Sequence, residues 1–312
     1  MGTTRSLKNA QKVREFRDAV GGAELVEADM FDGKECFTRG EALRGVEFVF
    51  HTAAPLIGGV DKREQEEVVR RYVEATQYLV EEAVKNKVKQ VIFMASASNV
   101  IGQTPVADNS FVYSDASVFA DPKLVDRPNE RAKLLAEKVC WNVIRRQPPS
   151  EQRTALVSLL PYFMVGPPLF KSLVSANASC QAVTAILNNT QHGFPQVHLP
   201  AVDVRDVAAA HVRAMTLDSL RGKSGRYLVA SSSLWFSEVI ATLREEEKAL
   251  GKRIRTKIMG PLTLKLANLV NPETRALRPF VNQRIVVDGS QFELEFGVKY
   301  RRVDESLREM AH

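Results

Sequence analysis

The sequence predicts an α/β fold built on a doubly wound parallel sheet. Short runs rich in β-branched and aromatic residues alternate with longer helical patterns, which is typical of βαβ units. These runs fall at residues 24–27, 46–51, 90–94, 155–160 and 226–229. With 312 residues, of which 45% are hydrophobic and 26% charged, the chain is long enough to bury a sizeable core.

Two helices are predicted from apolar periodicity in the first half of the chain. Between the second and third runs, apolar residues recur at helical steps from Val69 to Ala83, which predicts one buried face of a long helix. A second helix is expected to begin near Asp126, a favourable N-cap, with Pro128 in its first turn. Its predicted apolar stripe consists of Ala132, Leu135, Ala136, Val139, Cys140, Val143 and Ile144.

In the second half of the chain, the sequence predicts one more core helix and a smaller lobe. The helix is expected at residues 204–215, after a loop around Pro195 and Pro200. After about Ser231, strand-like runs and helical patterns no longer alternate regularly. We therefore expect a smaller, mainly helical C-terminal lobe, interrupted by a short strand at residues 284–287.

Composition predicts no nucleic-acid, metal or membrane partner. The formal net charge of +6 does not by itself predict a nucleic-acid partner, because Lys and Arg alternate with Asp and Glu, as on a solvated helix face. The cysteines Cys36, Cys140 and Cys180 lie far apart and form no CxxC pair, so we expect reduced thiols and no metal site. The chain has no run of about eighteen apolar residues and no apolar start. We expect a cytoplasmic protein without a signal peptide or membrane span.

Six short segments carry a family pattern in their order and spacing. They are GVEFVFHTAAP (45–55), VKQVIFMASAS (88–98), AKLLAEKVCW (132–141), PYFMVGPPL (161–169), VDVRDVAAAHVRAM (202–215) and FELEFGVKYRRVDESLREM (292–310). Together they resemble the dihydroflavonol reductase and 3β-hydroxysteroid dehydrogenase branch of the extended short-chain dehydrogenases/reductases. The resemblance implies a Rossmann-type sheet that binds NAD(P) at the carboxyl ends of its strands. It also implies a cofactor-binding core of residues 1–165 and 194–232 and a substrate lobe of residues 166–193 and 233–312.

The same resemblance implies positions that bind NADP(H) or NAD(H). Arg5 matches the arginine that pairs with the extra ribose phosphate of NADP, with Lys8 nearby, and a planar guanidinium suits that task. A solvated basic N-terminus would explain Arg5 equally well. The other matched positions are Asp29 and Met30 beside the adenine, Ala53, Ala54 and Pro55 in a turn after a strand, and Pro161 and Lys133.

The family's diphosphate-binding turn is not found in this sequence. The chain contains no GxxGxxG cluster, the turn that lets the diphosphate lie on a helix N-terminus. Since the chain begins beside the second strand of the family, we expect that a first βα unit of about thirty residues is missing. Without this turn the diphosphate loses its main backbone cradle.

The catalytic helix of the family carries a YxxxK motif, and Lys133 matches its lysine. In that chemistry the tyrosine transfers a proton, the lysine lowers its pKa and holds the nicotinamide ribose, and a serine fixes the substrate oxygen. Ser96 is our choice for the serine, with Ser98 as the alternative. Asn129 stands in the tyrosine position, and an amide does not titrate near neutral pH. Loss of general acid catalysis typically costs on the order of 100 to 10,000-fold in rate.

Further positions depart from the family pattern. Ala132 replaces the motif serine, and Tyr72 and Ala75 replace an asparagine and a glycine that the family often has. Tyr113 could supply a phenol from another direction, but a loop tyrosine is more often a packing residue. Two histidines, His51 and His211, lie in apolar patterns and are expected to be core residues rather than bases.

These features support two hypotheses about function. The first is an NAD(P)H-dependent oxidoreductase of the dihydroflavonol reductase type, acting on a small-molecule carbonyl or alcohol. The second is a non-catalytic nucleotide-sensing or protein-binding relative, motivated by Asn129, Ala132 and the missing glycine turn. The sequence does not show the oligomeric state, and a homodimer is considered because dimers are the commonest soluble oligomers.

Overall fold

The computed structural model describes residues 2–4, 7–8, 10–21, 24–29, 31, 43–55, 57, 61–103, 105–148, 153–170, 174, 177–191 and 193–312. Within these ranges, no helix is long and apolar enough to cross a membrane. Three residues considered above, Arg5, Met30 and Cys36, lie outside the described residues.

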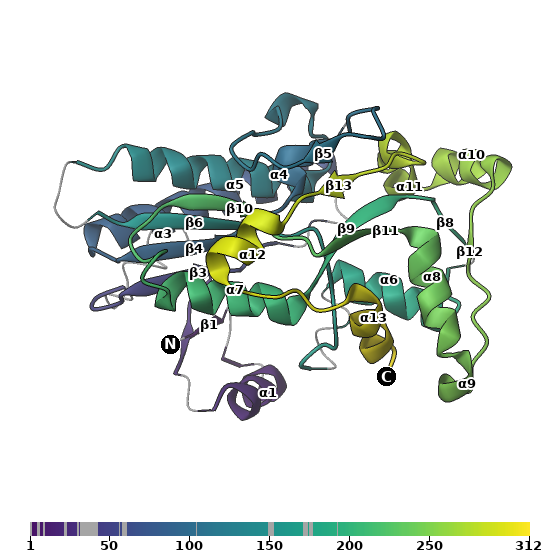
Figure 1. The fold of residues 1–312 in the computed structure, drawn as a ribbon. Helices are drawn as coiled ribbons and strands as arrows, with labels where there is room; N and C mark the ends of the chain where they lie inside the picture. The colour runs from purple at the N-terminus through teal and green to yellow at the C-terminus, as the bar shows by residue number, and fades with distance from the viewer. Residues whose placement is uncertain are drawn as a thin grey trace.

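Four parallel strands form the main sheet, in the order β10 (Gly225–Leu228), β6 (Ala155–Leu160), β4 (Gln90–Met94) and β3 (Phe48–His51) (Figure 1). Two further strands, β1 (Gly2–Thr4) and β2 (Leu25–Glu27), pair with each other in parallel as a separate sheet. All five predicted runs form strands of these two sheets. The strand β1 was not predicted, because its residues, Gly2 to Thr4, include no apolar side chain.

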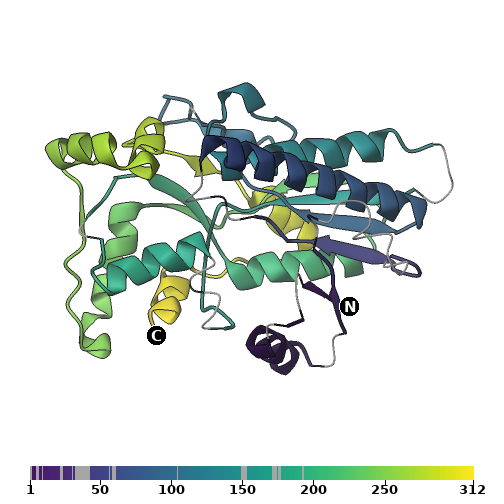
Figure 2. The same cartoon turned by 180° about the vertical axis from the view of Figure 1, so that it is seen from behind.

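Helices cover both faces of the main sheet, which confirms the doubly wound arrangement. The helices α3 (Lys62–Lys85) and α5 (Pro128–Arg145) pack side by side on one face, and α7 (Val204–Thr216) lies on the other (Figures 1 and 2). Because side chains of a strand point to alternate faces, the strand β4 contributes to two cores. Its Val91 and Phe93 join the larger cluster, and Ile92 joins the smaller cluster beside α7.

A second sheet extends the core toward the C-terminal lobe. It has the order β11 (Ser232–Trp235), β9 (His198–Asp203) and β7 (Phe163–Val165), with β9 antiparallel to β11 and parallel to β7. Two small parallel pairs join β12 (Lys257–Ile258) to β8 (Gly193–Phe194) and β13 (Val286–Val287) to β5 (Val112–Tyr113). The remaining elements are α1 (Ala10–Val20), α4 (Ser98–Ile101), β5 (Val112–Tyr113), η2 (Pro122–Leu124), α6 (Ala178–Leu187), β8 (Gly193–Phe194), α8 (Phe236–Glu245), α9 (Glu247–Leu250), β12 (Lys257–Ile258), α10 (Pro261–Val270), α11 (Pro272–Ala276), η4 (Arg278–Phe280), β13 (Val286–Val287), α12 (Ser290–Phe296) and α13 (Val303–Ala311).

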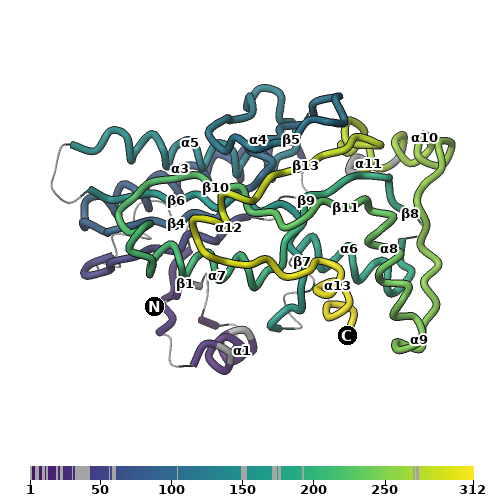
Figure 3. Tube along the Cα trace, viewed as in Figure 1, coloured from purple at the N-terminus to yellow at the C-terminus, as the bar shows by residue number. Residues whose placement is uncertain are grey.

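The chain crosses back to the main sheet near its C-terminal end. In Figure 3 the yellow segment that carries α12 lies over β10 and α7 before the chain reaches α13. Both Phe292 and Phe296 are fully buried there, in one cluster with Tyr227 of β10. The C-terminal segment therefore contributes side chains to the core of the main sheet as well as to the lobe.

Helix α5 begins differently from the prediction. Its N-cap is Arg127 and not Asp126, and no side chain caps it. The reason is Pro128, because a residue that precedes proline is pushed out of the helical region, and Arg127 is accordingly extended (φ −68°, ψ 120°). The buried stripe also differs, since Leu134 and Glu137 are buried on this helix and were not predicted to be.

Short strands near the lobe were also missed. Residues around Pro200 do not form a loop, because Pro200 lies inside β9. It is tolerated there because the pairing of β9 with β7 begins one residue later, at Ala201 opposite Phe163. The strands β11 and β12 escaped prediction as well, since each has at most four residues.

Candidate functional site

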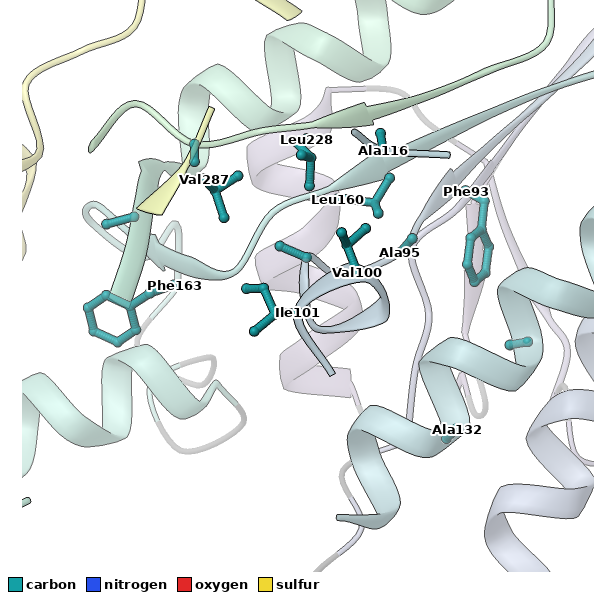
Figure 4. Packing of buried hydrophobic residues seen from close by; sticks show 14 of the residues in the cluster. Phe93, Ala95, Val100, Ile101, Ala116, Ala132, Leu160, Phe163, Leu228 and Val287 are labelled. Carbon is teal, nitrogen blue, oxygen red and sulfur yellow. The ribbon is translucent and has the colours of Figure 1, made fainter. Parts of the chain in front are cut away.

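The predicted catalytic residues gather at the carboxyl ends of the strands of the main sheet. Ser96 follows β4, Pro161 follows β6, and the first two turns of α5 carry Asn129 and Lys133. Figure 4 looks at this end of the sheet, where Ala95 follows β4 and Leu160 ends β6, with the part of α5 that carries Ala132 nearby. In open α/β sheets this edge is where ligands bind.

Lys133 joins helix α5 to the end of β4. Its Nζ donates a hydrogen bond to the Met94 carbonyl oxygen at 2.6 Å and lies 5.6 Å from the centre of the Phe93 ring. Burial lowers the pKa of Lys133 to about 8, and the nearby Glu137 carboxylate partly opposes this shift. An ammonium has three N–H donors, so two remain for a ligand.

The serine candidates differ in exposure. Ser98 is buried, with 4% of its surface exposed, whereas Ser96 is half-buried. Both the backbone N–H and the hydroxyl of Ser98 donate to Ser96 Oγ, at 3.2 and 2.8 Å. The Ser96 hydroxyl is then oriented by two donors and keeps its own O–H for an outside acceptor. This arrangement favours Ser96 over Ser98, and its catalytic role stays a prediction.

The side chain of Asn129 is engaged with the backbone. Its Oδ1 accepts a hydrogen bond from Ile57 N at 2.8 Å, and its Nδ2 donates to Ile57 O at 3.0 Å. The amide pairs with one residue through both of its ends, as a neighbouring strand would. It thus ties the segment after β3 to the first turn of α5.

The turn after β3 is supported from beneath by buried polar side chains. The Tyr72 hydroxyl donates to the Ala53 carbonyl oxygen at 3.2 Å, and its ring is fully buried. His51 Nε2 lies 3.0 Å from Thr76 Oγ1. Burial, together with the positive charge of Lys133, lowers the pKa of His51 to about 3. His51 is therefore neutral at pH 7, as expected for a core residue.

His211 and Tyr113 are also tied to backbone groups. His211 Nδ1 lies 2.8 Å from the Val207 carbonyl oxygen, and burial lowers its pKa. The Tyr113 hydroxyl accepts a hydrogen bond from Val106 N at 2.9 Å, and Tyr113 is 7% exposed. Tyr113 is consequently a packing residue, and it lies in the strand β5 rather than in a loop.

A buried ion pair behind Lys133 was not predicted. Glu137 is fully buried, and its carboxylate accepts hydrogen bonds from Arg226 Nε at 2.7 Å and Nη2 at 3.0 Å. Asn99 Nδ2 donates to the same carboxylate at 2.7 Å. In the sequence Glu137 is one of many charged helical residues, so no spacing signal distinguishes it.

The other positions predicted to bind the cofactor differ in their exposure and in their hydrogen bonds. Ala53 and Ala54 are small and exposed, so the backbone after β3 is open to a ligand. Asp29 is half-buried and caps its own turn, accepting a hydrogen bond from Phe31 N at 2.9 Å, and Lys8 is exposed. The spare donors of Lys133 fit the nicotinamide end of a dinucleotide, whereas Asp29 and Lys8 are the positions expected at its adenosine end. No residue that the structure describes belongs to a GxxGxxG turn for the diphosphate.

Comparison with known proteins gives consistent results. Residues 2–230 match the model of the NAD dependent epimerase/dehydratase family. Cinnamoyl-CoA reductase 1 of Arabidopsis thaliana is 29% identical over 317 residues, which cover all of this chain and 82% of the relative. Tetraketide alpha-pyrone reductase 2 of the same plant is 28% identical over 257 residues, covering 78% of this chain and 74% of the relative. Among solved structures, yeast methylglyoxal/isovaleraldehyde reductase complexed with NADPH superposes with a TM-score of 0.77 at 19% identity, covering 99% of this chain and 89% of that one.

Proposed function

Because the chain belongs to the NAD dependent epimerase/dehydratase family, as the sequence led us to expect, we propose that it is an NAD(P)H-dependent reductase of a small carbonyl compound. The relatives that support this proposal carry the names of cinnamoyl-CoA and tetraketide alpha-pyrone reductases. A fold neighbour from yeast was crystallised with NADPH, which supports the same choice of cofactor.

The observation that carries the proposal is the position of Lys133. Its ammonium is bound to the carbonyl oxygen of Met94, which ends β4 and lies two residues before Ser96. The ammonium keeps two N–H donors for a ribose hydroxyl. A reduced nicotinamide, when bound, supplies a hydride to the carbonyl carbon. Ser96 would donate its O–H to the carbonyl oxygen and so orient the carbonyl for that transfer. Asn129 is bound to Ile57 and supplies no proton.

The test is NADPH oxidation by the purified full chain. We would offer aldehydes, ketones and CoA thioesters, including cinnamoyl-CoA, methylglyoxal and isovaleraldehyde, and measure NADPH binding in parallel. Lys133→Met should lower turnover by about 100-fold or more. The matched control is Lys138→Met, which removes a lysine of the same helix whose ammonium lies over the Phe119 ring. Binding of NADPH without turnover of any carbonyl would count against the proposal.

A non-catalytic relative that binds a nucleotide is the second candidate. The observation that favours it is the Asn129 amide, which fills the tyrosine position and is engaged with Ile57. On this hypothesis Asn129→Tyr should produce little turnover even where NADPH binds. A gain of about 100-fold or more would contradict it.

The remaining parts of the proposal concern organisation and partners. We assign cofactor binding to residues 1–165 and 194–232 and substrate selection to residues 166–193 and 233–312. We propose a homodimer that acts in the cytoplasm on a small molecule rather than on nucleic acid. Cys140 and Cys180, both buried free thiols, suit a reducing compartment. Light scattering tests the homodimer, a fluorescent fusion tests the location in the cell, and a binding assay with oligonucleotides tests the absence of a nucleic-acid partner.

A further inference from the structure

A short helix at the outer end of the C-terminal lobe presents leucines to solvent. Figures 1 and 2 show α10 at the rim of the molecule, beside α11, which is its main packing partner. Leu262, Leu266 and Leu269 are 72%, 56% and 68% exposed. Because they are spaced by four and three residues, they form one apolar stripe along the helix. Single exposed leucines are common on protein surfaces, but a contiguous apolar stripe marks a site of interaction.

The helix that carries the apolar stripe is capped at both ends. Pro261 lies in its first turn, where the missing N–H of proline costs nothing. At the other end, Arg275 of α11 donates from Nε to Asn268 O at 2.9 Å and from Nη2 to Leu269 O at 3.0 Å. These are terminal carbonyl groups of α10, which have no partner within the helix. The leucines therefore lie on a formed helix.

The positive charge of the protein is concentrated beside the apolar stripe. The 25 residues from Lys248 to Pro272 contain six Lys and Arg and no Asp or Glu, so their formal charge of +6 equals that of the whole chain. Averaged over 312 residues this excess is small, which is why composition predicted no membrane partner. In the fold the excess falls on one continuous segment that includes α10.

Three of these cations line the segment that leads into α10. This segment runs along the rim of the lobe from α9 to α10 (Figure 3). Ile254 and Thr256 are buried, whereas the alternate residues Arg253, Arg255 and Lys257 are exposed. The alternation places the three cations together on the outer side. Within the part of the chain that the structure describes, no ion pair includes any of them.

Lys265 joins the charge to the apolar stripe. It lies three residues after Leu262 and four residues before Leu269, so it flanks the stripe on the same side of α10. Its side chain is exposed and takes part in no ion pair of the described residues. Leucines flanked by cations are typical of a helix that lies in the interface of a membrane.

We propose that α10 and the basic segment before it, residues 252–257, bind the surface of a membrane that contains anionic phospholipids. The apolar stripe enters the boundary between headgroups and acyl chains, while the cations stay at the level of the phosphates. With ten residues, α10 is too short to span a bilayer, so it lies along the surface. The cytoplasmic leaflet carries the negative surface potential that attracts such segments. The proposal does not depend on the reductase function.

Other partners match this surface less well. A single-stranded nucleic acid is bound by cations together with aromatic side chains, but residues 248–272 contain no Phe, Tyr, Trp or His. A second copy of the chain would cover the leucines, but it would bring two basic segments together, and like charges across an interface repel each other. A membrane interface supplies anionic groups and hydrocarbon at the same place.

Sedimentation of the full chain with lipid vesicles tests the proposal. We expect binding to phosphatidylcholine vesicles that contain about 30% phosphatidylserine, and at least about 10-fold weaker binding to phosphatidylcholine alone, because each cation near the surface contributes about fivefold. Raising the salt concentration should weaken the binding by screening. Failure to bind the anionic vesicles, or equal binding to both kinds, would overturn the proposal.

A first pair of variants tests the apolar stripe. Leu262→Gln with Leu266→Gln should weaken binding to anionic vesicles by at least about 10-fold, because the apolar area that enters the interface is lost. The matched control is Leu294→Gln with Leu124→Gln, which removes leucines that are 84% and 63% exposed elsewhere and should change binding by less than about threefold. All four leucines are exposed, so the thermal midpoints should stay close to that of the wild type.

A second pair of variants tests the charge. Lys257→Gln with Lys265→Gln should weaken binding to anionic vesicles by about 10-fold or more. Lys62→Gln with Lys299→Gln removes the same charge from exposed positions elsewhere and should change binding by less than about threefold. If the variants of α10 bind as tightly as the wild type, or if both pairs of lysines have equal effects, this surface does not bind the membrane.

Fluorescence distinguishes insertion of α10 from other modes of association. In Leu266→Trp, lipids brominated in their acyl chains should quench the emission added to that of the wild type, whereas in Leu294→Trp they should not. Vesicle-bound protein without this quenching would overturn the proposal. Two further outcomes would also overturn it: binding to mixed oligonucleotides but not to vesicles, and a dimer in light scattering that Leu262→Gln with Leu266→Gln converts to a monomer.

Discussion

The double hydrogen bond between Asn129 and Ile57 predicts a measurable loss of stability when the amide is removed. In Asn129→Leu the side chain keeps a similar size but can neither accept from Ile57 N nor donate to Ile57 O. Each such bond contributes roughly 0.5–1.5 kcal/mol, and leaving the partly buried Ile57 groups unpaired adds to the cost. We expect the free energy of unfolding to fall by about 2 kcal/mol, a large part of the roughly 5–15 kcal/mol typical of a folded protein.

Urea unfolding, followed by circular dichroism, measures this loss. Asn142→Leu is the matched control, because Asn142 is an exposed residue of the same helix and its replacement should change stability by less than about 0.5 kcal/mol. Asn129→Asp should lose at least as much as Asn129→Leu, since it puts a second oxygen against Ile57 O. If Asn129→Leu unfolds at the urea concentration of the wild type, the amide does not hold the segment after β3, and the structural reason for its presence is wrong.

Three further predictions concern buried charges. Glu137→Leu should lower the free energy of unfolding by about 3–5 kcal/mol, because Arg226 is left buried without its carboxylate. Adding Arg226→Leu should recover part of that loss. If the losses of the two single variants simply add up in the double variant, as measured by urea unfolding, the two side chains are not coupled. The folded-state pKa of His51 is lowered from 6.5 to about 3. The contribution of neutral His51 to the free energy of unfolding is therefore complete above pH 6.5 and is lost as the pH falls toward 3. Relative to His51→Phe, the wild type should lose at most about 5 kcal/mol across that range, and parallel pH profiles would refute this assignment. The pKa of Lys133 is lowered from 10.5 to about 8. The wild type should therefore gain stability relative to Lys133→Met as the pH rises from 8 to 10.5. A difference in the free energy of unfolding that stays constant over this range would show that the ammonium is not desolvated.

Local patterns predicted most of the main sheet and its helices. The strands β4 and β6 are short buried runs, and the apolar stripe of α3 repeats with the period of a helix. These signals are local, because each arises from side chains that share one face of one element. The boundary of α5 was less accurate, since the effect of Pro128 on Arg127 overrode the capping preference of Asp126.

The candidate site was predicted only in part. The order of the family segments identified the positions of Lys133, Ser96 and Asn129, and the structure brings all three to one edge of the sheet. The sequence showed that Asn129 departs from the motif but not what the amide does instead. Its partner, Ile57, is 72 residues away in the chain.

The sequence by itself determined the alternation of strands and helices, the family and the position of the candidate lysine, Lys133, because these depend on local periodicity and on the order of short motifs. The tertiary structure decided which polar groups meet. Glu137 and Arg226 lie 89 residues apart, and Ile57 and Asn129 lie 72 residues apart. Such contacts depend on the order of strands in the sheet, and the spacing of residues along the chain does not encode that order.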